Sequence, residues 1–169
     1  MKATLVIMAA GLGSRYGGSK QVDGIGPNGE ILMEYSVYDA LRAGFGKVVF
    51  IIKPEMEELV RGLCGDYLEK RTAGDGSPVE VAYAFQDFSS LPPFYALPPE
   101  RTKPFGTVHA LLCAAEAVCE PCCVINADDY YGIDAYRAMY EELGRLPAAG
   151  KAAMVGYLLK NTASLHGTV

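Results

Sequence analysis

The segment M-A-A-G-L-G-S-R-Y-G-G-S-K-Q, residues Met8–Gln21, follows directly on an apolar run that begins at Ala3. The apolar run predicts a buried β-strand, and the glycines after it allow backbone N–H groups to approach a ligand closely. A series of such N–H groups forms a concave anion site, and Arg15 and Lys20 add positive charges suited to phosphate oxygens. The segment therefore predicts a phosphate-binding loop after the first strand.

Spacing separates the known kinds of glycine-rich phosphate loop. A P-loop needs a Ser or Thr after its lysine, whereas Lys20 is followed by Gln21. A dinucleotide-binding loop needs G-x-G-x-x-G leading into a helix, but the third glycine comes one residue late and the turn-rich stretch from Asp23 to Gly29 follows. The spacing therefore argues against both a P-loop protein and a dehydrogenase.

The loop resembles that of the sugar nucleotidylyltransferases, also called NDP-sugar pyrophosphorylases. That family has an apolar strand, then A-A-G-x-G-[ST]-R, then a lysine several residues later. The family usually has Pro before this lysine, where the present chain has Ser19. The resemblance implies that nucleotide phosphates are bound by the matching residues Ala10, Gly11, Gly13, Ser14, Arg15 and Lys20.

Three later elements resemble the same family in order and type. Gln86 ends the apolar run Val79–Phe85, and its amide could donate to and accept from a uracil or thymine edge. Gly106 and Thr107 match a turn in which the backbone approaches the base before a helix begins. Asp128 follows a fourth apolar run and matches the family's Mg²⁺ ligand. A carboxylate suits this hard cation.

The resemblance implies nucleotidyl transfer from a nucleoside triphosphate, with UTP or dTTP favoured, to a sugar 1-phosphate. Arg15 would bind the leaving pyrophosphate, Lys20 would offset charge at the α-phosphate, and Asp128 would hold Mg²⁺. Two alternatives stay open. One is a cytidylyltransferase that acts on a phosphorylated non-sugar acceptor, and the other is a nucleotide-binding regulatory module without catalysis.

Composition limits the partners and the location. The formal net charge of −5 argues against nonspecific nucleic-acid binding, which needs a basic face. No signal peptide and no apolar run of membrane-spanning length is evident, so we expect no membrane partner and a cytoplasmic protein. The five cysteines are an odd number, which argues against a disulfide framework, and we expect them to be buried and inert.

Strand-like and helix-like patterns alternate along the chain. This alternation predicts an α/β fold, a Rossmann-like three-layer α/β/α arrangement around a mostly parallel sheet. Ligands bind such sheets at the carboxyl ends of the strands, where Gly11, Gln86 and Asp128 all fall. We expect strands at Ala3–Met8, Val48–Ile52, Val79–Phe85, Cys123–Asn126 and Ala152–Leu159, and helices over Ile31–Phe45, Met56–Tyr67, Val108–Ala115 and Ile133–Leu143.

Residues 1–169 are expected to form one catalytic domain that holds the nucleotide-binding half of the family's enzyme. The resemblance implies a longer domain, so the chain looks truncated at the C-terminus and lacks most of the sugar-binding half. An uncovered sheet edge would favour association, which leaves a homo-oligomer open. The proline-rich loop Asp87–Lys103 could be a lid, an oligomer contact or a stiffened insertion.

Overall fold

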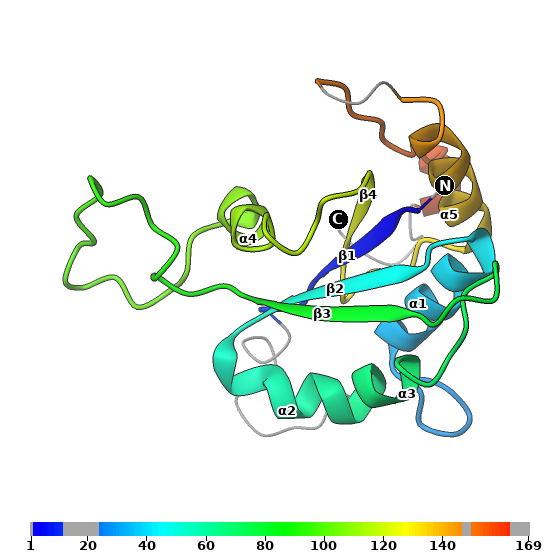
Figure 1. Ribbon diagram of the computed structural model, residues 1–169, viewed down its shortest axis with the longest axis horizontal. Coiled ribbons are helices and arrows are strands. Elements are labelled where there is room, and N and C mark those ends of the chain that lie inside the picture. The colour runs from blue at the N-terminus through cyan, green and yellow to red at the C-terminus, as the bar shows by residue number, and fades with distance from the viewer. Residues whose placement is uncertain (1, 12–23, 147–149, 163–169) are drawn as a thin grey trace.

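A four-stranded sheet forms the centre of the described part of the chain (Figure 1). The computed structural model describes residues 2–11, 24–146 and 150–162. In these residues the strand order is β3-β2-β1-β4 and every neighbouring pair runs parallel. The strands are β1 (Thr4–Met8), β2 (Lys47–Ile52), β3 (Glu80–Phe85) and β4 (Cys122–Asn126).

Helical segments connect the strands. The connection from β1 to β2 contains α1 (Leu32–Ala43), and that from β2 to β3 contains the 3₁₀ turn η1 (Pro54–Met56), α2 (Glu57–Val60), the π-helical turn η2 (Arg61–Gly65) and α3 (Asp66–Leu68). The short helix α4 (Thr107–Cys113) precedes β4, and α5 (Ile133–Leu143) and α6 (Leu159–Thr162) follow it.

The two faces of the sheet are covered unequally. Alternate strand residues point to opposite faces, so Leu5 and Ile7 lie in the larger core cluster and Val6 in the smaller one. The larger cluster contains residues of α1, α2 and α5, whereas the smaller one receives Ala110 of α4 and the following Ala114. Figure 1 shows α2 and α3 below the sheet and α4 above it. This arrangement confirms the predicted Rossmann-like three-layer α/β fold.

Local sequence explains where α1 begins and ends. The Glu34 carboxylate accepts a hydrogen bond from the backbone N–H of Ile31 at 2.7 Å, which satisfies a donor at the start of the helix. Gly44 ends the helix with φ of 117°, a left-handed conformation that glycine adopts readily. A Cβ at this position would also lie 2.8 Å from the ring of Tyr140, so α5 packs closely there.

The helix predicted over Met56–Tyr67 is present, but it is irregular. It passes from a 3₁₀ turn through α-helical turns into a π-helical turn at Arg61–Gly65. Glycine weakens a helix interior, and here Gly65 also makes room for β3. A Cβ on Gly65 would lie 1.9 Å from the hydroxyl oxygen of Tyr83, so only glycine allows this approach.

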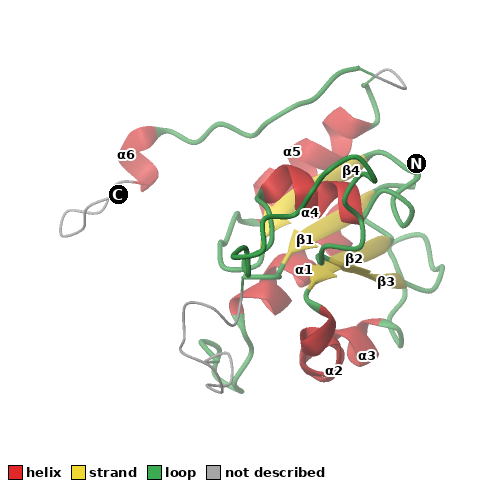
Figure 2. Cartoon of the chain, turned by 90° about the vertical axis from the view of Figure 1, so that its left-hand side faces the viewer, coloured by secondary structure: helices red, strands yellow, loops and turns green. Residues whose placement is uncertain are grey.

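The strand predicted at Ala152–Leu159 is wrong. Residues 151–158 form no strand, and α6 begins at Leu159. The segment runs as an extended arm, and Figure 2 shows α6 well away from the sheet. The arm forms one wall of an apolar groove of about 620 Å³ beside β4 and α5, and the Tyr157 hydroxyl donates a hydrogen bond to the Tyr131 carbonyl at 2.9 Å.

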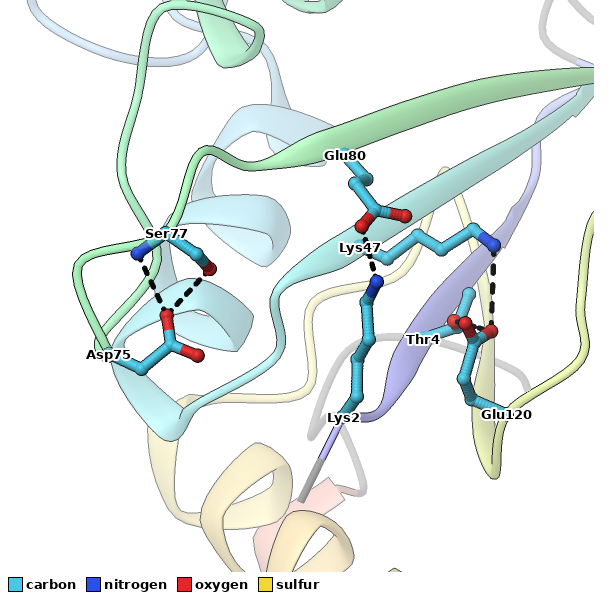
Figure 3. A network of polar contacts seen from close by, with 7 residues as sticks. All are labelled: Lys2, Thr4, Lys47, Asp75, Ser77, Glu80 and Glu120. Carbon is cyan, nitrogen blue, oxygen red and sulfur yellow. Dashed lines mark hydrogen bonds and ion pairs between the residues drawn. The ribbon is translucent and has the colours of Figure 1, made fainter.

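Charged side chains at the amino end of the sheet pair with one another (Figure 3). Lys2 bonds to Glu80, which begins β3. Glu120 accepts hydrogen bonds from Lys47 at 3.5 Å and from the Thr4 hydroxyl at 3.2 Å. These contacts link the starts of β1, β2 and β3 and the segment before β4, and two of them reach across an intervening strand.

Candidate functional site

The carboxyl ends of β1 and β4 lie next to each other. Met8 stands opposite Asn126 in the strand register, and the Ala127 N–H donates to the Met8 carbonyl at 3.3 Å. On the other side of β1, the Ala9 N–H donates to the Ile51 carbonyl at 2.8 Å. The chain therefore leaves the sheet after Ala9 and after Ala127 at the same edge.

The glycine-rich loop starts at this edge. Ala10 is half-buried and Gly11 is exposed in a turn directly after the strand. No described atom lies within 4 Å of the position that a Cβ on Gly11 would take, so described packing does not require glycine there. The other predicted phosphate-binding residues, Gly13, Ser14, Arg15 and Lys20, lie outside the described residues.

The two aspartates after β4 are placed differently. The Asp129 carboxylate accepts hydrogen bonds from the Asn126 side-chain amide at 2.8 Å and from the Tyr131 hydroxyl at 3.3 Å. The same Tyr131 hydroxyl accepts the Asn126 backbone N–H at 3.1 Å, so Asp129 shapes the turn. Asp128 is exposed beside it, immediately after the residue that continues the ladder to β1.

Asp128 fits the chemistry of a magnesium ligand. Mg²⁺ is usually held by one or two carboxylates together with substrate phosphates and water. Within residues 2–11, 24–146 and 150–162, no cluster of three or more His, Cys, Asp or Glu side chains could hold a metal ion. Asp128 is exposed at the carboxyl end of β4, beside the strand that leads into the glycine-rich segment.

Gln86 and Gly106 lie together, from segments about twenty residues apart. Gln86 continues the ladder after β3, since its N–H donates to the Ile52 carbonyl at 2.8 Å. Its side-chain amide donates to the carbonyls of Phe105 at 2.6 Å and Gly106 at 3.4 Å, and the residue is 7% exposed. Gly106 precedes α4, and Thr107 is its first residue. The amide group of Gln86 therefore holds the turn before α4, a role that sequence reasoning missed.

The long loop after β3 packs around Phe105. The rings of Phe88 and Tyr95 meet the Phe105 ring edge-on, with centroids 6.2 and 5.6 Å away. The Arg101 guanidinium lies 3.9 Å from the centroid of the Phe105 ring, and the His109 ring meets the same side chain at 5.6 Å. Aromatic residues thus anchor a segment that carries no secondary structure.

A second polar pair was also missed by sequence reasoning. The Tyr130 hydroxyl donates to the Asp39 carboxylate on α1 at 3.0 Å, and the backbone carbonyl of Asp129 accepts from the Ser36 hydroxyl at 3.4 Å. The hydrogen bond to Asp39 raises the pKa of Tyr130. These contacts fix the turn after β4 to α1, and nothing in the local pattern around Tyr130 indicates them.

The expectation that the cysteines are buried is correct for Cys64 and wrong for the others. Cys119 is exposed, and Cys113, Cys122 and Cys123 are half-buried. Cys122 and Cys123 begin β4, which lies at one side of the sheet that the described residues form. All five thiols are free of disulfides.

Comparisons with known proteins point to the fold. No family model and no curated protein matches the sequence. Among solved structures, the chain is similar to the crystal structure of a UDP-glucose pyrophosphorylase complexed with UDP-glucose, with a TM-score of 0.55 and 18% sequence identity. The likeness is one of fold. It covers 86% of this chain and 54% of that one, so the chain spans about half the length of the solved structure.

Within residues 2–11, 24–146 and 150–162, no helix is both long and apolar enough to cross a membrane.

Proposed function

We propose that this chain is the nucleotide-binding half of a sugar-1-phosphate nucleotidyltransferase. A sugar 1-phosphate oxygen would attack the α-phosphorus of UTP or dTTP, giving an NDP-sugar and pyrophosphate. One observation carries the proposal: the glycine-rich loop and Asp128 leave adjacent parallel strands at the carboxyl edge of the sheet. Ligands of open α/β sheets bind at that edge. The fold likeness to a UDP-glucose pyrophosphorylase supports the same proposal.

The loop would bind the phosphates. Backbone N–H groups from Ala10 to Ser14 would donate to the phosphate oxygens, and the absence of a side chain at Gly11 would let them approach. Arg15 would hold the leaving pyrophosphate and Lys20 would offset charge at the α-phosphate. Such a reaction depends on positioning and charge, and it needs no covalent nucleophile.

Asp128 would hold the magnesium ion that accompanies the triphosphate. When bound, Mg²⁺ polarises phosphate oxygens and neutralises developing charge. Asp129 would keep Asp128 in place, because its carboxylate is engaged by Asn126 and Tyr131.

The binding site for the nucleotide base would be lined by Gln86, Gly106 and Thr107. The two carbonyls that Gln86 holds belong to the turn that begins α4, so this side chain would shape the base site. Direct reading of uracil by the Gln86 N–H groups would require them to exchange these carbonyl partners. We therefore propose that Gln86 positions the turn before α4, a role that needs no change in its hydrogen bonds.

A nucleotide panel tests the proposal. Thermal unfolding of the chain is measured with UTP, dTTP, CTP, ATP, GTP and NAD, each with and without Mg²⁺. Ligand at 100 times its Kd should stabilise the protein by about 2.7 kcal/mol. We expect a Mg²⁺-dependent shift with UTP or dTTP that is lost in Asp128→Asn and retained in Glu120→Gln, the control at the opposite end of the sheet.

Other outcomes of the panel separate the alternatives. A shift with CTP alone would favour transfer to a non-sugar acceptor. A shift with NAD and none with triphosphates would overturn the proposal in favour of a dinucleotide-binding protein. Triphosphate binding without pyrophosphate release in the natural full chain would identify a regulatory module.

A further inference from the structure

Three reactive side chains meet where the long loop touches α4. Ser90 comes from the loop, and His109 and Cys113 lie one helical turn apart on α4. The Ser90 Oγ lies 3.0 Å from His109 Nε2 and 3.1 Å from Cys113 Sγ. The distance from Cys113 Sγ to His109 Nε2 is 3.8 Å, so the three atoms form a compact triangle in which the Ser90 hydroxyl is within hydrogen-bonding distance of both other side chains. None of these residues belongs to the proposed nucleotide site.

Burial of the histidine decides the direction of the hydrogen bonds. His109 is 8% exposed, and its buried Nδ1 has no hydrogen-bond partner among the described residues. A buried N–H without an acceptor is rarer in proteins than an unused lone pair. The proton therefore belongs on Nε2, which donates to Ser90 Oγ.

The serine then has its own hydrogen to donate. Two acceptors are within reach: Cys113 Sγ at 3.1 Å and the Asp87 carbonyl at 3.5 Å. The sulfur is the nearer of the two, and once the Cys113 thiol has lost its proton the resulting thiolate would be a stronger acceptor than the neutral carbonyl. In that state the hydrogen bonds would run from His109 through Ser90 to the sulfur of Cys113.

The other cysteines lack this arrangement. Burial raises the pKa of the Cys64 thiol to about 12 and that of the Cys123 thiol to about 11, which suppresses the thiolate. Burial also raises the pKa of Cys122. Cys119 is exposed and stands outside the cluster, so it serves as an internal reference for an ordinary thiol.

We propose that Cys113 is a modification site that forms mixed disulfides with small, uncharged disulfides. The Cys113 thiol loses its proton to water, and its thiolate, held by the Ser90 hydroxyl, attacks one sulfur of the reagent. A new S–S bond forms to Cys113, the S–S bond of the reagent breaks, and the leaving thiolate takes a proton from water. No other oxidant or reductant is needed.

Modification would also release the loop. Ser90 Oγ and Cys113 Sγ are 3.1 Å apart, which leaves no room for a second sulfur between them. A mixed disulfide must therefore displace Ser90 or turn away from it, and either movement removes a contact that holds the loop to α4. Because Phe105 packs against both the loop and His109, the loosened segment would extend to the turn held by Gln86.

Exchange kinetics test the reactivity. The chain is treated with 2-hydroxyethyl disulfide at neutral pH, and each cysteine is followed by peptide mass spectrometry. We expect Cys113 to react about tenfold faster than the more exposed Cys119, the rate difference that one hydrogen bond to the reacting group can supply. Ser90→Ala should lower the Cys113 rate to that of Cys119. Ser89→Ala, its neighbour in the loop, is the matched control and should change neither rate.

Two variants of His109 test whether its N–H donor contributes to the reaction rate of Cys113. His109→Gln keeps an N–H donor near Ser90 and should retain most of the Cys113 rate, whereas His109→Leu should lose it. An unfolded variant would expose Cys64 and speed its reaction, so a slower Cys113 with an unreactive Cys64 cannot arise from unfolding. Equal rates for Cys113 and Cys119 in the unaltered protein, or an unchanged Cys113 rate in Ser90→Ala, would overturn the proposal.

Proteolysis tests the release of the loop. Trypsin can cut after Arg101, whereas Lys103 is protected by the following Pro104. Mixed disulfide formation should speed cleavage after Arg101 in the unaltered chain. The same treatment should leave the cleavage rate of Cys113→Ala unchanged. Cleavage that is equally fast before and after modification of Cys113 would contradict a coupled loop.

Discussion

The two ends of the sheet use polar residues in opposite ways. At the amino end, charged side chains are paired with each other, as in Lys2 with Glu80 and Lys47 with Glu120 (Figure 3). At the carboxyl end, the glycine-rich loop and the exposed Asp128 leave neighbouring strands side by side. We infer that the charged pairs at the amino end serve folding, and we propose that the ligand binds at the carboxyl end.

The largest expected effect is on catalysis at the carboxyl end. Lys20→Ala or Asp128→Asn should lower kcat by about 10²-fold or more, the scale of losing one preorganised electrostatic group. Turnover is measured as pyrophosphate release from UTP or dTTP and a sugar 1-phosphate, in the natural full chain. Glu120→Gln at the amino end should leave kcat unchanged. Near-normal turnover in either carboxyl-end variant would remove that residue from the proposed mechanism.

A backbone substitution at the amino end should affect stability alone. Gly44 has φ of 117°, and a Cβ there would lie 2.8 Å from the Tyr140 ring. Gly44→Ala should therefore lower the free energy of unfolding by about 1–3 kcal/mol, measured by chemical denaturation. Gly29→Ala is a useful comparison, because that residue also has positive φ but no described atom within 4 Å of the added Cβ. If the close approach to Tyr140 matters, Gly44→Ala lowers the free energy of unfolding more than Gly29→Ala does. Equal losses would show that the positive φ alone accounts for the effect.

A substitution at Gln86 should have a smaller effect on stability and a separate effect on the ligand. Gln86→Leu removes the donor to the carbonyls of Phe105 and Gly106 in a residue that is 7% exposed. We expect a loss of about 1–2 kcal/mol in the free energy of unfolding, the cost of leaving a buried acceptor unpaired. Discrimination between UTP and CTP should also weaken, measured as the ratio of their Kd values. Unchanged stability would show that the turn before α4 does not depend on this amide.

The smallest expected effect concerns acid stability at the amino end. Burial opposes ionisation of Glu120, but the hydrogen bond from Thr4 and the charge of Lys47 together lower the pKa of this carboxyl below 4.5. A carboxyl whose pKa is lower in the folded state contributes stability above the unfolded value, and this contribution disappears as the pH falls through the folded value. Below pH 4.5 the unaltered chain should therefore lose more stability than Glu120→Gln.

Urea denaturation at about pH 6 and about pH 3 measures this difference, which should remain below about 1 kcal/mol for a partly exposed ion pair. Equal acid sensitivity in the two proteins would show that Glu120 does not contribute.

Much of the fold could be predicted because the strands are nearly continuous apolar runs between turn residues. The four parallel strands and their carboxyl edge follow from that pattern, and so does the position of Gly11 and Asp128. The predicted strand at Ala152–Leu159 is wrong because an apolar pattern does not supply a hydrogen-bonding partner, and strand formation depends on such partners.

The side-chain contacts could not be predicted in the same way. Ser90 and His109 are nineteen residues apart, across a proline-rich loop without periodicity. Only the spacing of His109 and Cys113, one helical turn, was visible in the sequence, and that spacing alone does not reveal the serine. Likewise, the sequence alone could not show that the Gln86 side-chain amide donates hydrogen bonds to the carbonyls of Phe105 and Gly106.

Chemical-shift mapping shows whether a nucleotide binds at the carboxyl ends of the strands. Backbone amide chemical shifts of the chain are compared before and after saturation with UTP and Mg²⁺. We expect large shifts at Gly11, Gln86 and Asp128 and none beyond background at Lys47, Glu80 and Glu120. Shifts concentrated at the amino end, or no shifts anywhere in a cooperatively folded protein, would contradict a nucleotide site at the carboxyl edge of the sheet.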